Sequence, residues 1–303
     1  MSETFEHVRL VIADPTPMVR QGLRTALFAL GFRSITDISS FTKLHDIIEQ
    51  DAADLIVTSS ALEGNDCGFL IQENRNQRLG ANPFVMVIVL LANAEPDYVK
   101  RVIDSGSDDL LLTPVAPDQL ILRIERLSRA RKPFVITHDY TGPDRRVKTR
   151  TFDSHSAPMM EVPNLLRLRM TGVDGIKIDA QVREAAATLN RIKIERHAVQ
   201  LDWLVSHISA SVRDGMGDGP SLIPHTHRLV TVAEDMVKRM QGTPAEGYIS
   251  QVAELLEGAR KADADPTAIA FADLERMHLQ SKLISRSLGN PQPSVAVNLK
   301  KAG

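Results

Sequence analysis

The stretch VRLVIADPTPMVRQGLRTALFALGF, Val8–Phe32, decides the fold class, because its apolar residues change spacing part-way along. The first part, Val8–Asp14, is a short apolar run rich in β-branched residues, which is typical of a buried strand. In the second part, apolar residues recur every three or four positions, the period of an α-helix. These residues are Val19, Leu23, Leu27 and Leu30. The stretch predicts a buried strand followed by an amphipathic helix.

The same alternation of apolar runs and amphipathic stretches continues to about residue 130. The further strand-like runs are SITDIS, ADLIVTS, FVMVIVLLA and DDLLLTP. Buried strands that alternate with helices are typical of a parallel sheet covered on both faces. We therefore predict a five-stranded, doubly wound α/β domain over residues 1–135. Its ligand crevice is expected at the carboxyl ends of the strands, near Asp14, Ser59, Leu91 and Thr113.

The pattern changes after this domain. Residues 136–175 contain proline and glycine turns and predict a linker with turns, in which a short hairpin is the one element considered. Residues 176–289 show helical periods and predict a mostly α-helical C-terminal domain. The polar, proline-bearing tail 290–303 is expected to be disordered.

The C-terminal domain is expected to begin with one long helix that ends before the DGMGDGPS segment. Its apolar stripe shifts by two residues after Ile192, so the two halves of the helix are predicted to face different partners. Three more helices are expected around His225–Met240, Ala245–Ala259 and Thr267–Leu288. Trp203 is expected in the core or at a helix–helix interface, because it lies at helical spacing among aliphatic residues.

Composition excludes several protein classes. The chain of 303 residues is 43% hydrophobic and 24% charged, with a net charge of −2, as in ordinary soluble globular proteins. Its single cysteine, Cys67, excludes an internal disulfide framework. No apolar run approaches the roughly 20 residues of a membrane span, and the N-terminus has no apolar signal segment. We expect a cytoplasmic protein without a membrane partner.

Residues 8 to about 130 resemble the receiver domain of bacterial two-component response regulators, over nearly the full length of that domain. Three stretches carry the resemblance: Val8–Phe32, DLIVTSSALEGNDCG and SGSDDLLLTPVAPDQLILRIERL. It implies a flavodoxin-like fold whose carboxyl edge holds a phosphorylation site.

The resemblance also assigns the functional positions of that site. In receiver domains an aspartate accepts phosphate beside a carboxylate pair, a hydroxyl residue and a lysine. Here the pair corresponds to Ala13 and Asp14, the acceptor to Ser59, the hydroxyl residue to Leu91 and the lysine to Thr113. Only Asp14 keeps the expected side chain. Because Mg²⁺ in proteins commonly needs more than one oxygen ligand, the resemblance implies a degenerate site, a pseudo-receiver without a cofactor.

A basic stretch runs from Arg123 to Arg150, through the end of the predicted last helix and past Arg131. Arg145, Arg146, Lys148 and Arg150 are candidates for binding an anion, because guanidinium groups pair with phosphate. Arg146 and Arg150 have the R-x-x-x-R spacing of cyclic-di-GMP-binding PilZ domains, but the second motif of those domains is absent. A turn held by local ion pairs is the simpler interpretation.

Histidines suggest two further sites, neither of which the sequence completes. His197 lies in a helical stretch, IERHAVQLDWL, without the neighbours of a phosphotransfer motif, so we expect a surface histidine. His225 and His227 could bind metal only with further ligands that the sequence does not supply. We therefore predict no metal site, no catalytic residue and no enzyme activity.

The leading hypothesis is an atypical, phosphorylation-independent response regulator that acts through protein–protein contacts as a homodimer. The resemblance implies an interaction face on the fourth helix, last strand and last helix. Its residues are Tyr98, Arg101, Asp108, Asp109, Arg123 and Arg126. One alternative is a DNA-binding transcriptional regulator that uses the basic linker or the helical domain. Another is a phosphorelay member or a nucleotide-sensing regulator.

Overall fold

The computed structural model describes residues 4–145, 157–213 and 219–289. The chain forms two compact units, Met1–Leu189 and Asn190–Gly303, which we call the N-terminal and C-terminal units. Among the described residues, no helix combines the length and the apolar composition that crossing a membrane requires.

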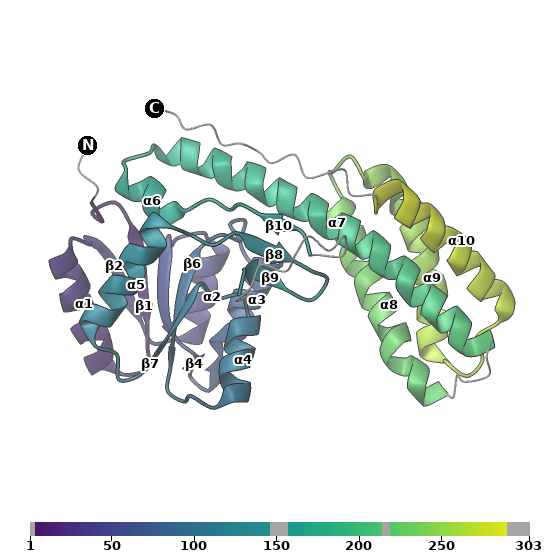
Figure 1. The fold of residues 1–303 in the computed structure, drawn as a ribbon, viewed down its shortest axis with the longest axis horizontal. Helices are drawn as coiled ribbons and strands as arrows, with labels where there is room; N and C mark the ends of the chain where they lie inside the picture. The colour runs from purple at the N-terminus through teal and green to yellow at the C-terminus, as the bar shows by residue number, and fades with distance from the viewer. Residues whose placement is uncertain (1–3, 146–156, 214–218, 290–303) are drawn as a thin grey trace. The chain divides into compact units, whose positions relative to one another are not determined.

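The N-terminal unit is built on a five-stranded sheet with the order β2-β1-β3-β6-β7 (Figure 1). Its strands are β1 (Arg9–Ala13), β2 (Ser34–Ile38), β3 (Leu55–Ser59), β6 (Met86–Leu91) and β7 (Asp109–Leu112). All neighbouring strands of this sheet run parallel. This strand order is that of flavodoxin-like folds. The predicted doubly wound sheet is confirmed.

Helices cover both faces of this sheet (Figure 1). They are α1 (Pro17–Leu30), α2 (Phe41–Glu49), α3 (Cys67–Arg75), α4 (Pro96–Asp104) and α5 (Pro117–Arg129). Leu27 of α1 and Leu120 of α5 belong to one buried cluster, whereas Leu44 of α2 and Leu70 of α3 belong to the cluster on the other face. A two-stranded hairpin, β4 (Ala61–Leu62) with β5 (Asn65–Asp66), precedes α3.

The helix predicted after the first strand begins and ends where its sequence favours it. α1 has Pro17 in its first turn, where the backbone N–H of a helix has no internal partner. Gly31 ends α1 with a φ of 114°, a left-handed conformation that glycine adopts without strain. Leu23 and Leu27 are its buried residues, so the predicted apolar stripe faces the sheet.

The segment 136–175 differs from the predicted linker, because it adds secondary structure to the N-terminal unit. Its elements are β8 (Phe134–Ile136), β9 (Thr141–Pro143), β10 (Met159–Met160) and α6 (Leu165–Met170), with the strands paired in the order β10-β8-β9. Leu166 of α6 is fully buried in the same cluster as α1 and α5. The antiparallel pair β8–β9 agrees with the short hairpin considered for this segment, but the sequence does not place its strands, because two or three residues are too few to show a period.

The long helix expected at the start of the C-terminal domain is present as α7 (Gly175–Arg213). In its first half, which belongs to the N-terminal unit, the side chains of Ile178, Val182 and Leu189 are buried. Its second half contributes Ile194 and Ala198 to the core of the C-terminal unit. The shift of the apolar stripe therefore marks the change from one unit to the other.

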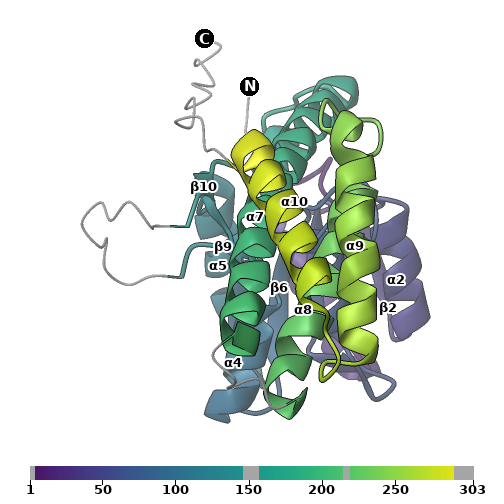
Figure 2. The same cartoon turned by 90° about the vertical axis from the view of Figure 1, so that its right-hand side faces the viewer.

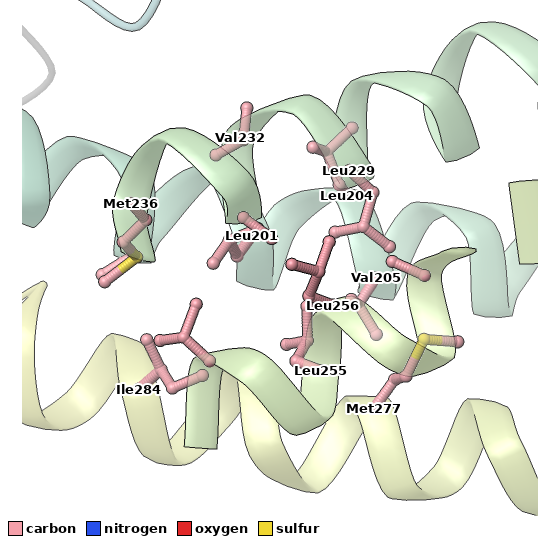
Figure 3. Close-up of a cluster of buried hydrophobic side chains, with 14 of the residues drawn as sticks. Leu201, Leu204, Val205, Leu229, Val232, Met236, Leu255, Leu256, Met277 and Ile284 are labelled. Atoms are coloured by element: carbon pink, nitrogen blue, oxygen red, sulfur yellow. The ribbon is translucent and has the colours of Figure 1, made fainter. Parts of the chain in front are cut away.

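The C-terminal unit is a helical bundle, as predicted (Figure 2). The second half of α7 is joined by α8 (Gly219–Met240), a short 3₁₀ helix (Glu246–Tyr248), α9 (Ile249–Ala264) and α10 (Phe271–Leu288). Each α-helix supplies apolar side chains to one core, such as Leu201, Met236, Leu255 and Ile284 (Figure 3). Trp203 does not join this core and is 56% exposed, but its ring lies 6.1 Å from that of His225 on α8, at the helix–helix contact that the spacing also allowed. The tail 290–303, expected to be disordered, lies outside the described residues.

Candidate functional site

The carboxyl edge of the parallel sheet brings together the residues predicted to form the site. Asp14 directly follows β1, Ser59 and Leu91 end β3 and β6, and Thr113 directly follows β7. The strand register aligns these ends, since Ser59 pairs with Leu90 and Leu91 pairs with Leu112. The topology therefore gathers the predicted site residues at one edge, as the strand order requires.

Asp14 is the one carboxylate among the five predicted positions, and it accepts hydrogen bonds from residues at the start of α1. Its Oδ1 accepts a hydrogen bond from the backbone N–H of Thr16 at 2.8 Å. Its backbone carbonyl accepts a bond from Arg20 at 2.6 Å. The residue is 5% exposed. A carboxylate that closes a turn in this way has one oxygen committed to the backbone.

The other positions offer no second acidic ligand. Ala13 is fully buried and Leu91 is 2% exposed, and both belong to the apolar cluster on one face of the sheet. The Leu91 carbonyl accepts two hydrogen bonds from Thr113. One comes from the hydroxyl at 3.1 Å and the other from the backbone N–H at 2.8 Å. Ser59 is half-buried at the end of β3. Apolar packing and backbone bonding therefore occupy the positions where phosphoryl chemistry needs charge.

Comparison with known proteins identifies the N-terminal unit. Residues 10–125 match the family model described as the response regulator receiver domain. This segment is a receiver domain. Receiver domains are signal-transduction modules of two-component systems, so the resemblance seen in the sequence is confirmed for this segment. No curated protein gives a significant match to the chain.

Solved structures similar to this chain include several receiver domains. That of the putative response regulator NarL from Mycobacterium tuberculosis is 21% identical, with 42% of this chain and 99% of that chain covered and a TM-score of 0.36. That of RcsB from Salmonella enterica serovar Typhimurium is 22% identical, with coverages of 42% and 92% and a TM-score of 0.36. That of the Francisella response regulator 1452 is 24% identical, with coverages of 39% and 94% and a TM-score of 0.35.

The predicted interaction face of the receiver domain is formed by α4, β7 and α5, and most of its residues lie near the surface. The Arg101 guanidinium lies 5.4 Å from the centre of the Tyr98 ring. The Asp109 carboxylate forms ion pairs with Arg126 at 2.6 Å and with Arg123 at 3.5 Å. The Arg126 side chain remains 59% exposed despite this contact. These residues form a surface of mixed charge whose ion pairs lie mostly within the domain.

Asp108 does not belong to this face, which corrects the prediction. Its side chain is 1% exposed and lies between Arg75 and Arg131, each at 3.0 Å. It also accepts the backbone N–H of Val87 at 2.9 Å. Successive side chains next to a strand point to opposite sides, so the adjacent Asp108 and Asp109 have different environments. Asp108 is a structural residue at the amino end of β7.

The sequence does not single out Arg75 or Arg131 as partners for this acid. Arg75 is fully buried at the end of α3, a position where a basic residue commonly lies exposed. Arg131 is part of the basic stretch, but it donates to the carbonyl of Pro163 at 2.8 Å as well as to Asp108. Only the folded chain brings these groups together, since more than 20 residues separate each arginine from Asp108.

The predicted anion-binding group is described only at its first member. Arg145 donates to the backbone carbonyl of Ser107 and so helps to hold the segment after β9 against the receiver domain. Arg146, Lys148 and Arg150 lie outside the described residues. Arg145 therefore has a structural contact that the basic pattern alone does not reveal.

His197, expected on the surface, is buried in the helical bundle. It is 3% exposed, and its Nε2 lies 2.7 Å from Asp235, which also receives Arg239 at 2.8 Å. Burial lowers the pKa of His197, although the hydrogen bond with Asp235 opposes this effect. Burial alone would raise the pKa of Asp235, but the hydrogen bond from His197 and the charge of Arg239 hold that pKa below its usual range. Such a buried histidine is not accessible to a phosphotransfer partner.

Replacing Asp108 by Asn is expected to destabilise the chain by roughly 3–5 kcal/mol, because two buried guanidinium groups lose the carboxylate between them. Asp109→Asn is the comparison variant and is expected to cost less than Asp108→Asn, because Asp109 is 10% exposed and its partner Arg126 is 59% exposed, whereas both partners of Asp108 are buried. Urea unfolding followed by circular dichroism measures both changes. Equal effects of the two substitutions would contradict the assignment of Asp108 to the interior.

The stability of the bundle is expected to fall as the pH falls. The folded-state pKa of His197 is lowered, so the unfolded chain binds more protons and stability is lost as the pH drops below about 6.5. The lowered pKa of Asp235 acts in the same direction below about 4. Urea unfolding followed by Trp203 fluorescence between pH 7.5 and 5.5 measures the first effect. His197→Gln should flatten this dependence, whereas the exposed His227→Gln should leave it unchanged.

Proposed function

We propose that this protein is an atypical response regulator that acts without aspartate phosphorylation, through protein–protein contacts rather than catalysis. The observation that carries the proposal is the carboxyl edge of the receiver domain. There the acceptor position holds Ser59, and Asp14 is the one acid among the five site positions.

Charge balance explains why these residues do not support the usual reaction. Phosphoryl transfer needs a divalent cation and positive groups to neutralise the phosphoryl oxygens. A lone carboxylate with one oxygen bonded to the Thr16 N–H is a weak ligand for Mg²⁺. A serine hydroxyl also needs a nearby base to become a nucleophile, and no other titratable side chain occupies the five positions.

Packing supports the same proposal. Ala13 and Leu91 belong to a buried cluster that also contains Leu62 and Val102. Burying apolar side chains at this edge stabilises the fold by about 25 cal/mol per Å² of apolar surface. The edge therefore contributes to the core instead of holding unpaired charge. A signal that does not arrive as phosphate would act on the surface of the domain.

Incubation of the full chain with acetyl phosphate and Mg²⁺ is expected to leave its intact mass unchanged, because the acceptor position holds Ser59 and Asp14 is the one acid among the five site positions. A receiver domain with all its acidic residues is the positive control for the phosphodonor. Addition of one phosphate that is absent in Ser59→Ala would overturn the proposal.

A second copy of the chain is the partner that we propose for the face of α4, β7 and α5. That face exposes Arg101 and Arg126 and also carries the acidic Asp109. A two-fold interface brings the same surface of both copies together, so charges of both signs on one face allow self-complementary pairing.

The double substitution Arg101→Glu with Arg126→Glu is expected to convert a dimer into a monomer, because like charges then face each other across the interface. Light scattering of the full chain measures the mass. Arg24→Glu with Arg33→Glu changes the net charge by the same amount at exposed positions next to α1 and β2, and should leave the mass unchanged. A wild-type monomer, or equal effects of both double variants, would contradict this role of the face.

A further inference from the structure

Two histidine side chains from different helices face each other in the C-terminal unit. The ring centres of His207 on α7 and His225 on α8 are 4.5 Å apart, with an angle of 65° between the rings. Trp203, one turn before His207, stacks on that ring at 5.1 Å and meets the edge of His225 at 6.1 Å. The three side chains form a group that we call the Trp–His cluster.

The environment of these two histidines differs from that of four other histidines in the described residues. His45, His138, His197 and His227 each lie within 4.0 Å of a carboxylate. His207 and His225 make no hydrogen bond and no ion pair with any residue that the structure describes. Two imidazoles placed together without an acid are unfavourable as cations, since like charges repel.

Neutral imidazole is the form that binds metal ions, through the lone pair of a ring nitrogen. His207 is exposed and His225 is half-buried, so solvent reaches the pair. Imidazole ligands suit Zn²⁺, Ni²⁺ and Cu²⁺, whereas Mg²⁺ and Ca²⁺ prefer oxygen.

We propose that His207 and His225 form a two-imidazole binding site for a divalent transition-metal ion of the zinc, nickel and copper class. Water fills the remaining coordination positions. The ion links α7 to α8 within the bundle, and Trp203 on the His207 ring limits the orientations of that imidazole. This site is separate from the receiver domain and does not depend on its proposed function.

Sequence spacing points to a different pair. His225 and His227 are close in sequence, but His227 lies 3.5 Å from Asp263 and is accounted for by that contact. The structure replaces it with His207, which is 18 residues before His225 in the chain. The missing ligand that the sequence could not supply comes from the neighbouring helix.

A second group in the N-terminal unit contains His45, Asp46 and Glu49 of α2, whose ligand atoms lie within 4.8 Å of one another. His45 already lies 3.3 Å from Asp46 and 4.0 Å from Glu49. The contacts are those of an ion pair on an exposed helix surface, which is commonly weak and needs no metal. This group is the natural comparison site for the experiment.

The test uses the untagged full chain, titrated with ZnCl₂, NiCl₂ and CuCl₂ at pH 7.5. Calorimetry measures affinity, and fluorescence reports position, because Trp203 is the single tryptophan of the chain. We expect saturable binding of one ion and a matching change in Trp203 emission, with Cu²⁺ bound most tightly. MgCl₂ and CaCl₂ should cause no change in emission.

Variants locate the site. His207→Ala and His225→Ala are each expected to weaken binding at least about 10-fold, because one of two protein ligands is lost. His227→Ala and His45→Ala should leave the affinity unchanged. All four residues are partly or fully exposed, so the variants should fold, which circular dichroism can verify.

A second measurement does not depend on fluorescence. Saturating Zn²⁺ should raise the melting temperature of the wild type, since an ion that binds only the folded state stabilises it, and should not raise that of His207→Ala. The proposal is overturned if Trp203 emission shows no saturable response, if binding is lost in His45→Ala alone, or if His227→Ala weakens it as much as His225→Ala.

Discussion

The carboxylate of Asp108, held between Arg75 and Arg131, is the interaction on which the N-terminal unit depends. Arg75 also donates to the carbonyls of Gly106 at 2.9 Å and Pro83 at 2.7 Å, and Arg131 donates to that of Pro163 at 2.8 Å. Burial lowers the pKa of Arg75 to about 10, against the attraction of Asp108, so the guanidinium keeps its charge at neutral pH. A buried charge of this kind is tolerated only while it remains paired. Through these two arginines, one acid connects the end of α3, the start of β7 and the segment that leads to α6.

The two ends of the same sheet consequently play opposite electrostatic roles. The amino end keeps one buried carboxylate, Asp108, between two buried guanidinium groups. At the carboxyl end, where receiver chemistry requires a cluster of acids, Leu91 and Ala13 belong to the apolar core. Strand order and helix packing depend on apolar burial, so the fold itself does not require a cluster of acids at this edge.

Elements whose apolar residues repeat at a regular spacing are predictable from the sequence, whereas contacts between residues far apart in the chain are not. The strand and helix of Val8–Phe32 are predictable because apolar spacing reports directly on which face is buried. The environments of Asp108 and His197 are not, since their partners Arg75 and Asp235 lie 33 and 38 positions away. The core position that the spacing allowed for Trp203 is not the one it takes, for a related reason. Helical spacing shows that a residue is near an apolar stripe, but a shift of one position turns it by about 100° around the axis.

The burial of Cys67 restricts how two copies of this chain can be joined. Its thiol is 0% exposed at the start of α3, and burial raises its pKa to about 11. Disulfide formation requires an accessible thiolate, so this sulfur is protected from oxidation while the domain stays folded. Cys67 is also the one cysteine in the sequence. A disulfide through Cys67 is therefore not available to join two folded copies of this domain, so contacts between such copies would not respond to the redox state of their surroundings through this residue.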